Sequence, residues 1–200
     1  MITVYHIPGS RSSRVVWVLE EMGLAYEALN VRTNPEAAER YKAANPTGAL
    51  PAIEDGGTVM FESMAICEYL AQRYGPTPLV VQPDEPDYPT YLQYLHYGEA
   101  TLSGMGATIM MYSRFLPEEM RDPKVAALAG DRMLQRFAPV EASLAKGDYL
   151  AAGRLTLADV SVGYAVSLAL FAGLGDRLAP SLKAYWERLS ARPALAKALA

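Results

Sequence analysis

Residues 45–63 decide the fold, and they read NPTGALPAIEDGGTVMFES. Two short apolar runs, 52–54 and 58–61, flank an Asp-Gly-Gly turn at 55–57, and this pattern predicts a β-hairpin. The hairpin is followed at once by a predicted helix over residues 63–74. A hairpin that leads straight into a helix is typical of a layered α/β domain.

Leu50 and Pro51 lie just before this hairpin. Proline fixes its own backbone angle and lacks an N–H group, so it pushes Leu50 towards an extended conformation. Pro51 is a candidate cis-proline: if the Leu50–Pro51 bond is cis, the Leu50 backbone is turned outward and left free to hydrogen-bond an extended peptide ligand. Glu62 and Ser63 open the next helix and could hold the charged end of that ligand, because helix N-termini favour carboxylates.

The residues before this stretch alternate between strand and helix patterns. Val15, Val18, Leu19 and Met22 recur at helical spacing and form one apolar stripe, which Gly23 ends. The predicted order is strand 2–5, helix 14–22, strand 26–31 and helix 36–44, followed by the hairpin and its helix. Such an order predicts a small α/β layer fold with a mixed four-stranded sheet.

The composition changes after residue 75. Prolines and acidic residues crowd a linker-like segment, and the rest of the chain is helical in character and rich in Ala and Leu. The box Thr156-Leu157-Ala158-Asp159 has a hydroxyl cap with an acid three residues later, and we interpret it as helix capping. The predicted helices cover residues 88–114, 122–146, 156–171 and 178–190, with a short last one from Pro193.

Composition argues against several classes of protein. The net charge of −4 over 200 residues offers no basic surface for nucleic acid. A single cysteine, Cys67, and two histidines leave no ligand set for a metal, so no metal cofactor is expected. The chain starts without a signal-peptide pattern and holds no run of about 18 apolar residues, so we expect a cytoplasmic protein without a membrane span.

These motifs, taken in order, resemble the cytosolic glutathione transferases over the whole chain. The resemblance is carried by Leu50-Pro51, Glu62-Ser63, the proline-rich linker and the all-helical second half. The segment Pro8-Gly9-Ser10-Arg11-Ser12-Ser13-Arg14 is similar to the bacterial, serine-type (theta, delta and beta-like) classes. The resemblance implies a thioredoxin-like glutathione-binding domain over 1–78, a linker over 79–87 and an all-helical domain over 88–200 that contributes the electrophile site.

The resemblance also implies a reaction. Members of the family bind glutathione as co-substrate, stabilise its thiolate and add it to hydrophobic electrophiles, often in detoxification. By this resemblance Ser10 is the catalytic hydroxyl, and Arg11 assists at the glutathione site. Ser12, Ser13 and Tyr5 remain open as alternative partners of the thiolate.

Three contacts to glutathione follow from the same resemblance. Leu50 would pair with the cysteinyl backbone, Glu62 would bind the γ-glutamyl ammonium, and Ser63 would bind the γ-glutamyl carboxylate. The sequence departs from the insect relatives at Gly48, where they carry a histidine for the glycyl carboxylate. That carboxylate therefore has no assigned partner, and Lys42 is only a candidate.

In the family the electrophile binds between the domains, against the first two helices after the linker. The candidate lining residues here are Tyr97, Met105, Met111 and Tyr112. The resemblance also implies a homodimer. Two alternatives stay open: glutathione-dependent isomerisation, ether cleavage or peroxide reduction on the same site, and a non-catalytic binding or regulatory protein that keeps the fold.

Overall fold

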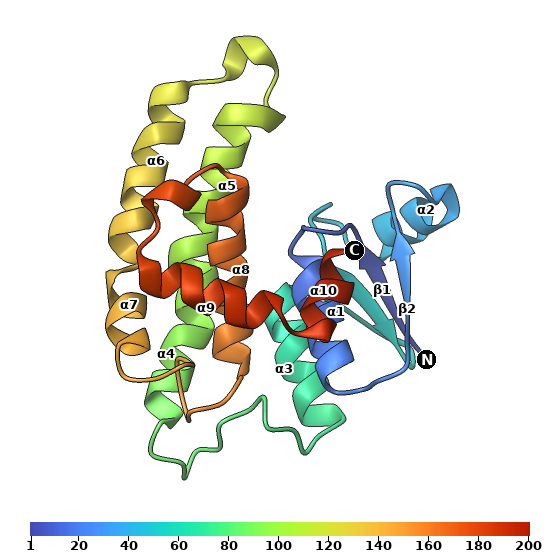
Figure 1. The fold of residues 1–200 in the computed structure, drawn as a ribbon. Coiled ribbons are helices and arrows are strands. Elements are labelled where there is room, and N and C mark those ends of the chain that lie inside the picture. The colour runs from blue at the N-terminus through green and yellow to red at the C-terminus, as the bar shows by residue number, and fades with distance from the viewer. The chain divides into compact units, whose positions relative to one another are not determined.

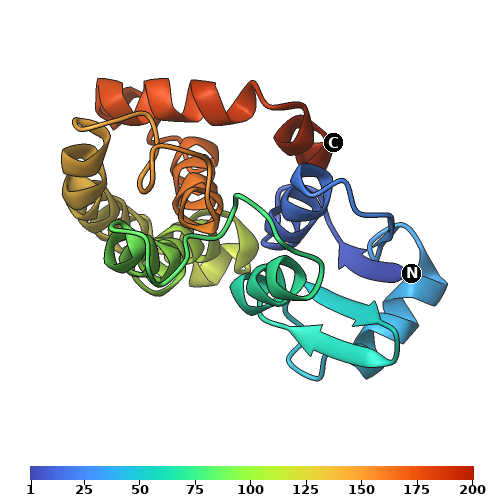
Figure 2. The ribbon, with the colours of Figure 1, turned by 90° about the horizontal axis from the view of Figure 1, so that it is seen from below.

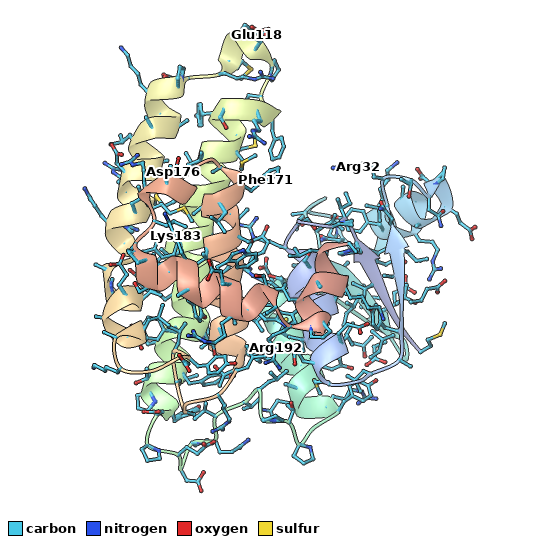
Figure 3. The ribbon with its side chains drawn as sticks, in the orientation of Figure 1. Arg32, Glu118, Phe171, Asp176, Lys183 and Arg192 are labelled. Carbon is cyan, nitrogen blue, oxygen red and sulfur yellow. The ribbon has the colours of Figure 1, made fainter.

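The computed structural model describes all 200 residues and divides into two compact units, whose α-helices are labelled in Figure 1. Unit 1 consists of Met1–Val80 and Ser190–Ala200, and unit 2 consists of Val81–Leu189. The predicted helical domain extended to residue 200, whereas the last helix, α10 (Pro193–Leu199), groups with unit 1. Two ion pairs hold it there: Arg192, labelled in Figure 3, with Glu21, and Lys197 with Glu20.

Unit 1 contains a four-stranded mixed sheet in the order β2-β1-β3-β4. The strands are β1 (Ile2–His6), β2 (Tyr26–Asn30), β3 (Ala52–Asp55) and β4 (Thr58–Phe61). β1 runs parallel to β2 and antiparallel to β3, and β3 and β4 form the antiparallel hairpin. This topology confirms the predicted α/β class and its mixed sheet.

Three helices cover the sheet of unit 1. Figure 2 shows α1 (Ser12–Glu21) and α3 (Ser63–Arg73) on one face and α2 (Pro35–Ala44) on the other. Every residue of β1 is buried, as are Val15, Val18 and Leu19 of the predicted apolar stripe, whereas Met22 lies just after α1 and is only partly buried. α1 begins two residues before the predicted start at Arg14.

Unit 2 is entirely helical. A continuous helical run over Tyr88–Phe115 consists of α4 (Tyr88–Tyr97), α5 (Gly104–Met110) and two π-helical segments, η1 (Gly98–Ser103) and η2 (Met111–Phe115). The remaining elements are η3 (Glu118–Met120), α6 (Pro123–Arg136), α7 (Ala138–Leu144), α8 (Leu157–Phe171), η4 (Gly175–Arg177) and α9 (Pro180–Ser190). No helix in the chain is long and apolar enough to cross a membrane.

The predicted helix over 122–146 is wrong in one respect, because it is two helices that meet at Phe137. Pro139 is the second residue of α7. A proline lacks the N–H that an interior helical position would donate, and its ring would clash with the carbonyl four residues earlier. The break therefore falls where proline is tolerated, in the first turn of a new helix.

α8 forms the centre of unit 2, and most of its residues are buried. α8 begins with the predicted capping box. The Thr156 side chain accepts from the Asp159 backbone N–H, and the Asp159 side chain accepts from the Thr156 backbone N–H. Close packing is visible at Gly98, where an added Cβ would lie 2.4 Å from Ser161 Oγ on α8. Only glycine lets the two helices approach this closely.

Candidate functional site

Three segments of unit 1 meet at one end of the sheet because of the strand register. Tyr5 on β1 pairs with Ala52 at the start of β3, and Ala52 pairs with Phe61 at the end of β4. Three segments therefore lie at the same end of the sheet: the loop after β1, the Leu50-Pro51 step before β3 and the Glu62-Ser63 pair after β4. The structure thus brings together the residues that the sequence singled out in unit 1.

The loop after β1 presents Ser10. The Ser10 N–H donates to the Ile7 carbonyl at 3.1 Å, and the Ser10 carbonyl accepts from the Ser13 N–H at 2.9 Å. Gly9 takes a φ of +77°, a left-handed conformation that glycine adopts without steric cost. These bonds fix the loop, and they leave Ser10 partly exposed beyond the end of β1.

The other two serines of this loop are buried. Ser13 Oγ accepts from the Gly9 N–H at 3.0 Å, and Ser12 Oγ accepts from the Ile7 N–H at 3.1 Å. Both hydroxyls thus satisfy backbone donors of the turn that precedes α1. Among the three serines, Ser10 is the one that is partly exposed.

Tyr5 is fully buried, and its hydroxyl donates to Glu54 Oε1. Glu54 Oε2 in turn accepts from Arg40 at 2.9 Å. Burial and the Glu54 carboxylate raise the pKa of Tyr5 to about 12. The Tyr5 proton is therefore held by a carboxylate within the fold, not offered to a ligand.

The Leu50–Pro51 peptide bond is cis. The backbone N–H and carbonyl of Leu50 form no hydrogen bond within the chain, so both groups are available to a partner. Buried Asn45 shapes the approach to this step: its Nδ2 donates to the Ala49 carbonyl at 2.5 Å, and its Oδ1 accepts from the Thr47 N–H at 3.0 Å. The sequence patterns did not point to Asn45.

Glu62 and Ser63 form the start of α3. Glu62 is exposed and has a φ of +74°, which is uncommon for a residue with a side chain. Ser63 is buried, and its Oγ accepts from Arg14 Nη1 at 3.0 Å. Arg14 is itself only 1% exposed, so a buried guanidinium lies beneath the N-terminus of α3. That charge and the helix dipole both favour an anion at this point.

Two other basic residues are less informative. Arg11 is the residue before α1 and is partly exposed beside Ser10. Lys42 is exposed and pairs with Glu39 at 2.6 Å. Gly48 takes a φ of +69°, so the shape of its loop favours glycine there.

The candidate electrophile residues lie on the helical run of unit 2. Tyr97 is on α4 and its hydroxyl donates to the Arg136 carbonyl at 2.8 Å, while Met105 is on α5. Met111, which is 41% exposed, and Tyr112 belong to the π-helical segment η2. Phe171, labelled in Figure 3, is exposed at the end of α8 and lies under the Arg114 guanidinium at 4.9 Å; the sequence patterns did not single it out.

Cys67 is buried on α3, and burial raises the pKa of its thiol to about 12. This thiol is therefore protonated and inaccessible. The chain holds no group of three or more His, Cys, Asp or Glu side chains arranged to bind a metal ion.

Comparison with known proteins places the chain in a family. Residues 1–72 match the glutathione S-transferase N-terminal domain, and residues 107–200 match the glutathione S-transferase C-terminal domain. Glutathione S-transferase 3 of Zea mays is 31% identical over 94% of this chain and 87% of its own. The chain belongs to the glutathione S-transferase family.

Solved structures of glutathione transferases share its fold. Ure2p5 from Phanerochaete chrysosporium, cocrystallized with 1-(S-glutathionyl)-2,4-dinitrobenzene, has a TM-score of 0.85 and 25% identity, covering 99% of this chain and 92% of its own. The theta class glutathione S-transferase from Xanthomonas axonopodis pv. citri, with glutathione bound, has a TM-score of 0.79 and 27% identity, covering 99% and 96%. The thioredoxin-like first domain and helical second domain are thereby confirmed.

Proposed function

We propose that this glutathione S-transferase is of the serine type and that Ser10 stabilises the thiolate of bound glutathione. The observation that carries the proposal is the partial exposure of one residue among the four candidates. All four hydroxyls have hydrogen bonds within the fold, but Ser12, Ser13 and Tyr5 are buried, whereas Ser10 is partly exposed at the end of the sheet where the three segments meet.

In this proposal, glutathione binds across the same end of the sheet. The unpaired backbone groups of Leu50 pair with the cysteinyl unit, next to the cis-proline Pro51. Glu62 binds the γ-glutamyl ammonium, and Ser63 with the N-terminus of α3 binds its carboxylate. Buried Arg14 supports that carboxylate electrostatically through Ser63.

The chemistry needs little more than one hydrogen bond. A free thiol has a pKa of about 8.5 and is mostly protonated at neutral pH. Lowering this pKa by two units requires about 2.7 kcal/mol of preference for the thiolate. One hydrogen bond to a charged group contributes about 1.5–3 kcal/mol, so the Ser10 hydroxyl can supply much of it. The thiol proton leaves to solvent, so no general base is needed. The thiolate sulfur then forms the bond to the electrophilic carbon, and with a chloro-nitro-aromatic substrate chloride leaves.

The two parts of the chain divide this work. Residues 1–78 bind glutathione, and residues 88–200 supply apolar side chains for the electrophile, among them Met105, Met111 and Tyr112. Methionine suits electrophiles of varied shape because its side chain is flexible and polarizable. The conjugate bound by Ure2p5 suggests nitro-aromatic electrophiles as the first class to test.

Exchange of Ser10 tests the proposal. We expect Ser10→Ala to lower kcat for a chloro-nitro-aromatic substrate by about tenfold to a hundredfold, with glutathione affinity nearly unchanged, because only the bond to the thiolate is lost. Ser181→Ala on α9 is a matched control for the loss of a hydroxyl. Unchanged turnover of Ser10→Ala would overturn the serine mechanism.

We further propose that two copies of the chain form a homodimer through unit 1. β4 is an edge strand, and its Val59 and Phe61 are 50% and 42% exposed. Apolar side chains on an open edge favour association with another surface. Analytical ultracentrifugation should give twice the mass of 21.8 kDa, and a Phe61→Glu variant should shift the protein towards the monomer.

A further inference from the structure

A chain of short hydrogen bonds leads from Ser10 into the protein. Ser10 Oγ lies 2.7 Å from Ser12 Oγ, and Ser12 Oγ lies 2.7 Å from His6 Nδ1. Ser12 and His6 are buried, with 0% and 7% of their surface exposed. The hydroxyl assigned to the thiolate is therefore the outer end of a chain whose inner end is an imidazole.

The direction of these bonds decides what Ser10 can do. A serine hydroxyl has one hydrogen to donate and two lone pairs to accept with. One lone pair of Ser10 Oγ faces the Ser12 N–H at 3.2 Å. If the Ser12 hydroxyl also donates to Ser10, both lone pairs are occupied and the Ser10 hydrogen is left for a ligand. If Ser10 donates to Ser12 instead, its hydrogen points into the protein and cannot stabilise a thiolate.

Which of these two directions holds depends on His6, because the Ser12 hydroxyl has only one hydrogen and two lone pairs. One lone pair of Ser12 Oγ is taken by the Ile7 N–H. When Nδ1 of His6 carries a hydrogen, it fills the second lone pair. The Ser12 hydrogen then has two acceptors, Ser10 Oγ at 2.7 Å and the Ile7 carbonyl at 3.2 Å, and the shorter distance favours Ser10. When Nδ1 is bare, it competes with Ser10 and the Ile7 carbonyl for the single Ser12 hydrogen, and a Ser12 hydroxyl that donates to Nδ1 leaves Ser10 to donate its own hydrogen inward.

We propose that His6 is a positioning residue whose Nδ1–H donates to Ser12, which makes Ser12 donate to Ser10 and Ser10 present its hydrogen to the glutathione thiolate. The inference rests on the proposed function of Ser10. No proton travels along the chain, and the thiol proton leaves to solvent. Each bond polarises the next, which strengthens the outermost donor. Burial lowers the pKa of His6, so the ring is neutral at pH 7 and its tautomer sets the direction.

Two substitutions of His6 separate this role from packing. His6→Phe keeps a planar ring but removes the donor, whereas His6→Asn places an amide N–H near the position of Nδ1. We expect His6→Phe to raise the pKa of enzyme-bound glutathione, measured by the ultraviolet absorbance of the thiolate, and to lower kcat at neutral pH by about threefold to tenfold. The affinity for S-methylglutathione, which has no thiol proton, should change less than about twofold because the peptide contacts remain.

The paired variants give distinct outcomes. His6→Asn should restore the pKa of bound glutathione and the turnover to near those of the unaltered protein. Equal losses in both variants would mean that His6 acts through packing alone and would overturn the proposal. An unshifted pKa in His6→Phe would overturn it as well.

The tautomer itself can be read in the unaltered protein without turnover. The chain has two histidines, His6 and His96, so ¹⁵N-labelled imidazole signals are assigned with a single His96→Gln control. We expect the Nδ1–H form of His6 in the glutathione complex, and the Nε2–H form would overturn the proposal. If the Nδ1–H form is found but Ser10→Ala keeps full activity, the direction of the hydrogen bonds from His6 to Ser10 is supported and the assignment of Ser10 to the thiolate fails. The two failures are therefore distinguishable.

Discussion

Two helices in this protein, α3 and α8, begin with an acidic residue and a hydroxyl residue, but the acidic residue has a different role in each. α3 begins with Glu62 and Ser63, and α8 begins with a box from Thr156 to Asp159. Asp159 is fully buried and accepts from the Leu150 N–H at 3.0 Å, the Thr156 N–H at 2.8 Å and the Tyr185 hydroxyl at 2.9 Å. Glu62 is exposed and caps α3 with no side-chain hydrogen bond.

The difference separates an acid that serves the fold from one that is free for a ligand. Every oxygen of Asp159 faces a donor inside the protein, so the group can only stabilise structure. Glu62 instead holds its backbone at an uncommon positive φ, a strain of the kind that clusters at functional sites. An acid beside a hydroxyl at a helix start is therefore informative about function only when its burial is known.

The largest expected effect comes from breaking the buried start. Asp159→Ala leaves several buried donors without an acceptor, and each such group costs about 1–3 kcal/mol. We expect the free energy of unfolding, measured by urea titration of the helical signal, to fall by about 4 kcal/mol or more. Thr58→Ala, on an exposed strand position, is the control and should change stability little. A loss below about 1 kcal/mol would contradict the structural role of Asp159.

The pH dependence of stability gives a second measure of the same group. Burial raises the pKa of Asp159 from 3.8 to about 6 in the folded protein. An acid whose folded pKa is raised contributes stability that is complete below its unfolded pKa and is lost as pH rises through its folded pKa. We therefore expect the Asp159 contribution to fall between pH 4 and pH 7, by about 3 kcal/mol for a shift of about two units.

The measurement compares the unaltered protein with Asp159→Asn by urea unfolding at several pH values. The difference between them should change over this window, because the variant lacks the titrating group. A difference that does not change with pH would show that the carboxyl stays charged, held by its hydrogen-bond donors.

How far the sequence could predict these two regions depends on how local the causes are. The hairpin over 52–61 and the capping box are set by residues a few positions apart, and both were predictable. The contact of Arg14 with Ser63 joins residues 49 positions apart, and only the folded sheet brings them together. The hydrogen-bond chain from His6 to Ser10 could not be predicted for another reason. Its residues are close in the sequence, but which of their hydroxyls are buried depends on packing with the rest of the fold.

A third prediction tests the ligand side of the comparison. Glu62→Gln keeps the size of the side chain but removes its charge, so the γ-glutamyl ammonium loses an ion pair. We expect glutathione affinity, measured by calorimetric titration, to fall about tenfold to a hundredfold because hydrogen bonds to charged groups are strong. The free energy of unfolding should stay nearly unchanged, in contrast to Asp159→Ala. Unchanged affinity would remove Glu62 from the site.

The smallest expected effect is also the sharpest contrast with α8. Glu62→Gly removes the side chain that makes a φ of +74° costly, and glycine adopts such angles freely. Relief of this strain should raise the free energy of unfolding by about 1 kcal/mol, less the added backbone freedom of glycine in the unfolded chain. Glutathione affinity should fall as it does in Glu62→Gln. A variant that becomes more stable while it binds less tightly would show that the fold maintains a strained residue at α3 for the ligand, which Asp159 on α8 does not require. A destabilised Glu62→Gly would instead show that the side chain supports the helix start, and the contrast between the two acids would then be one of degree.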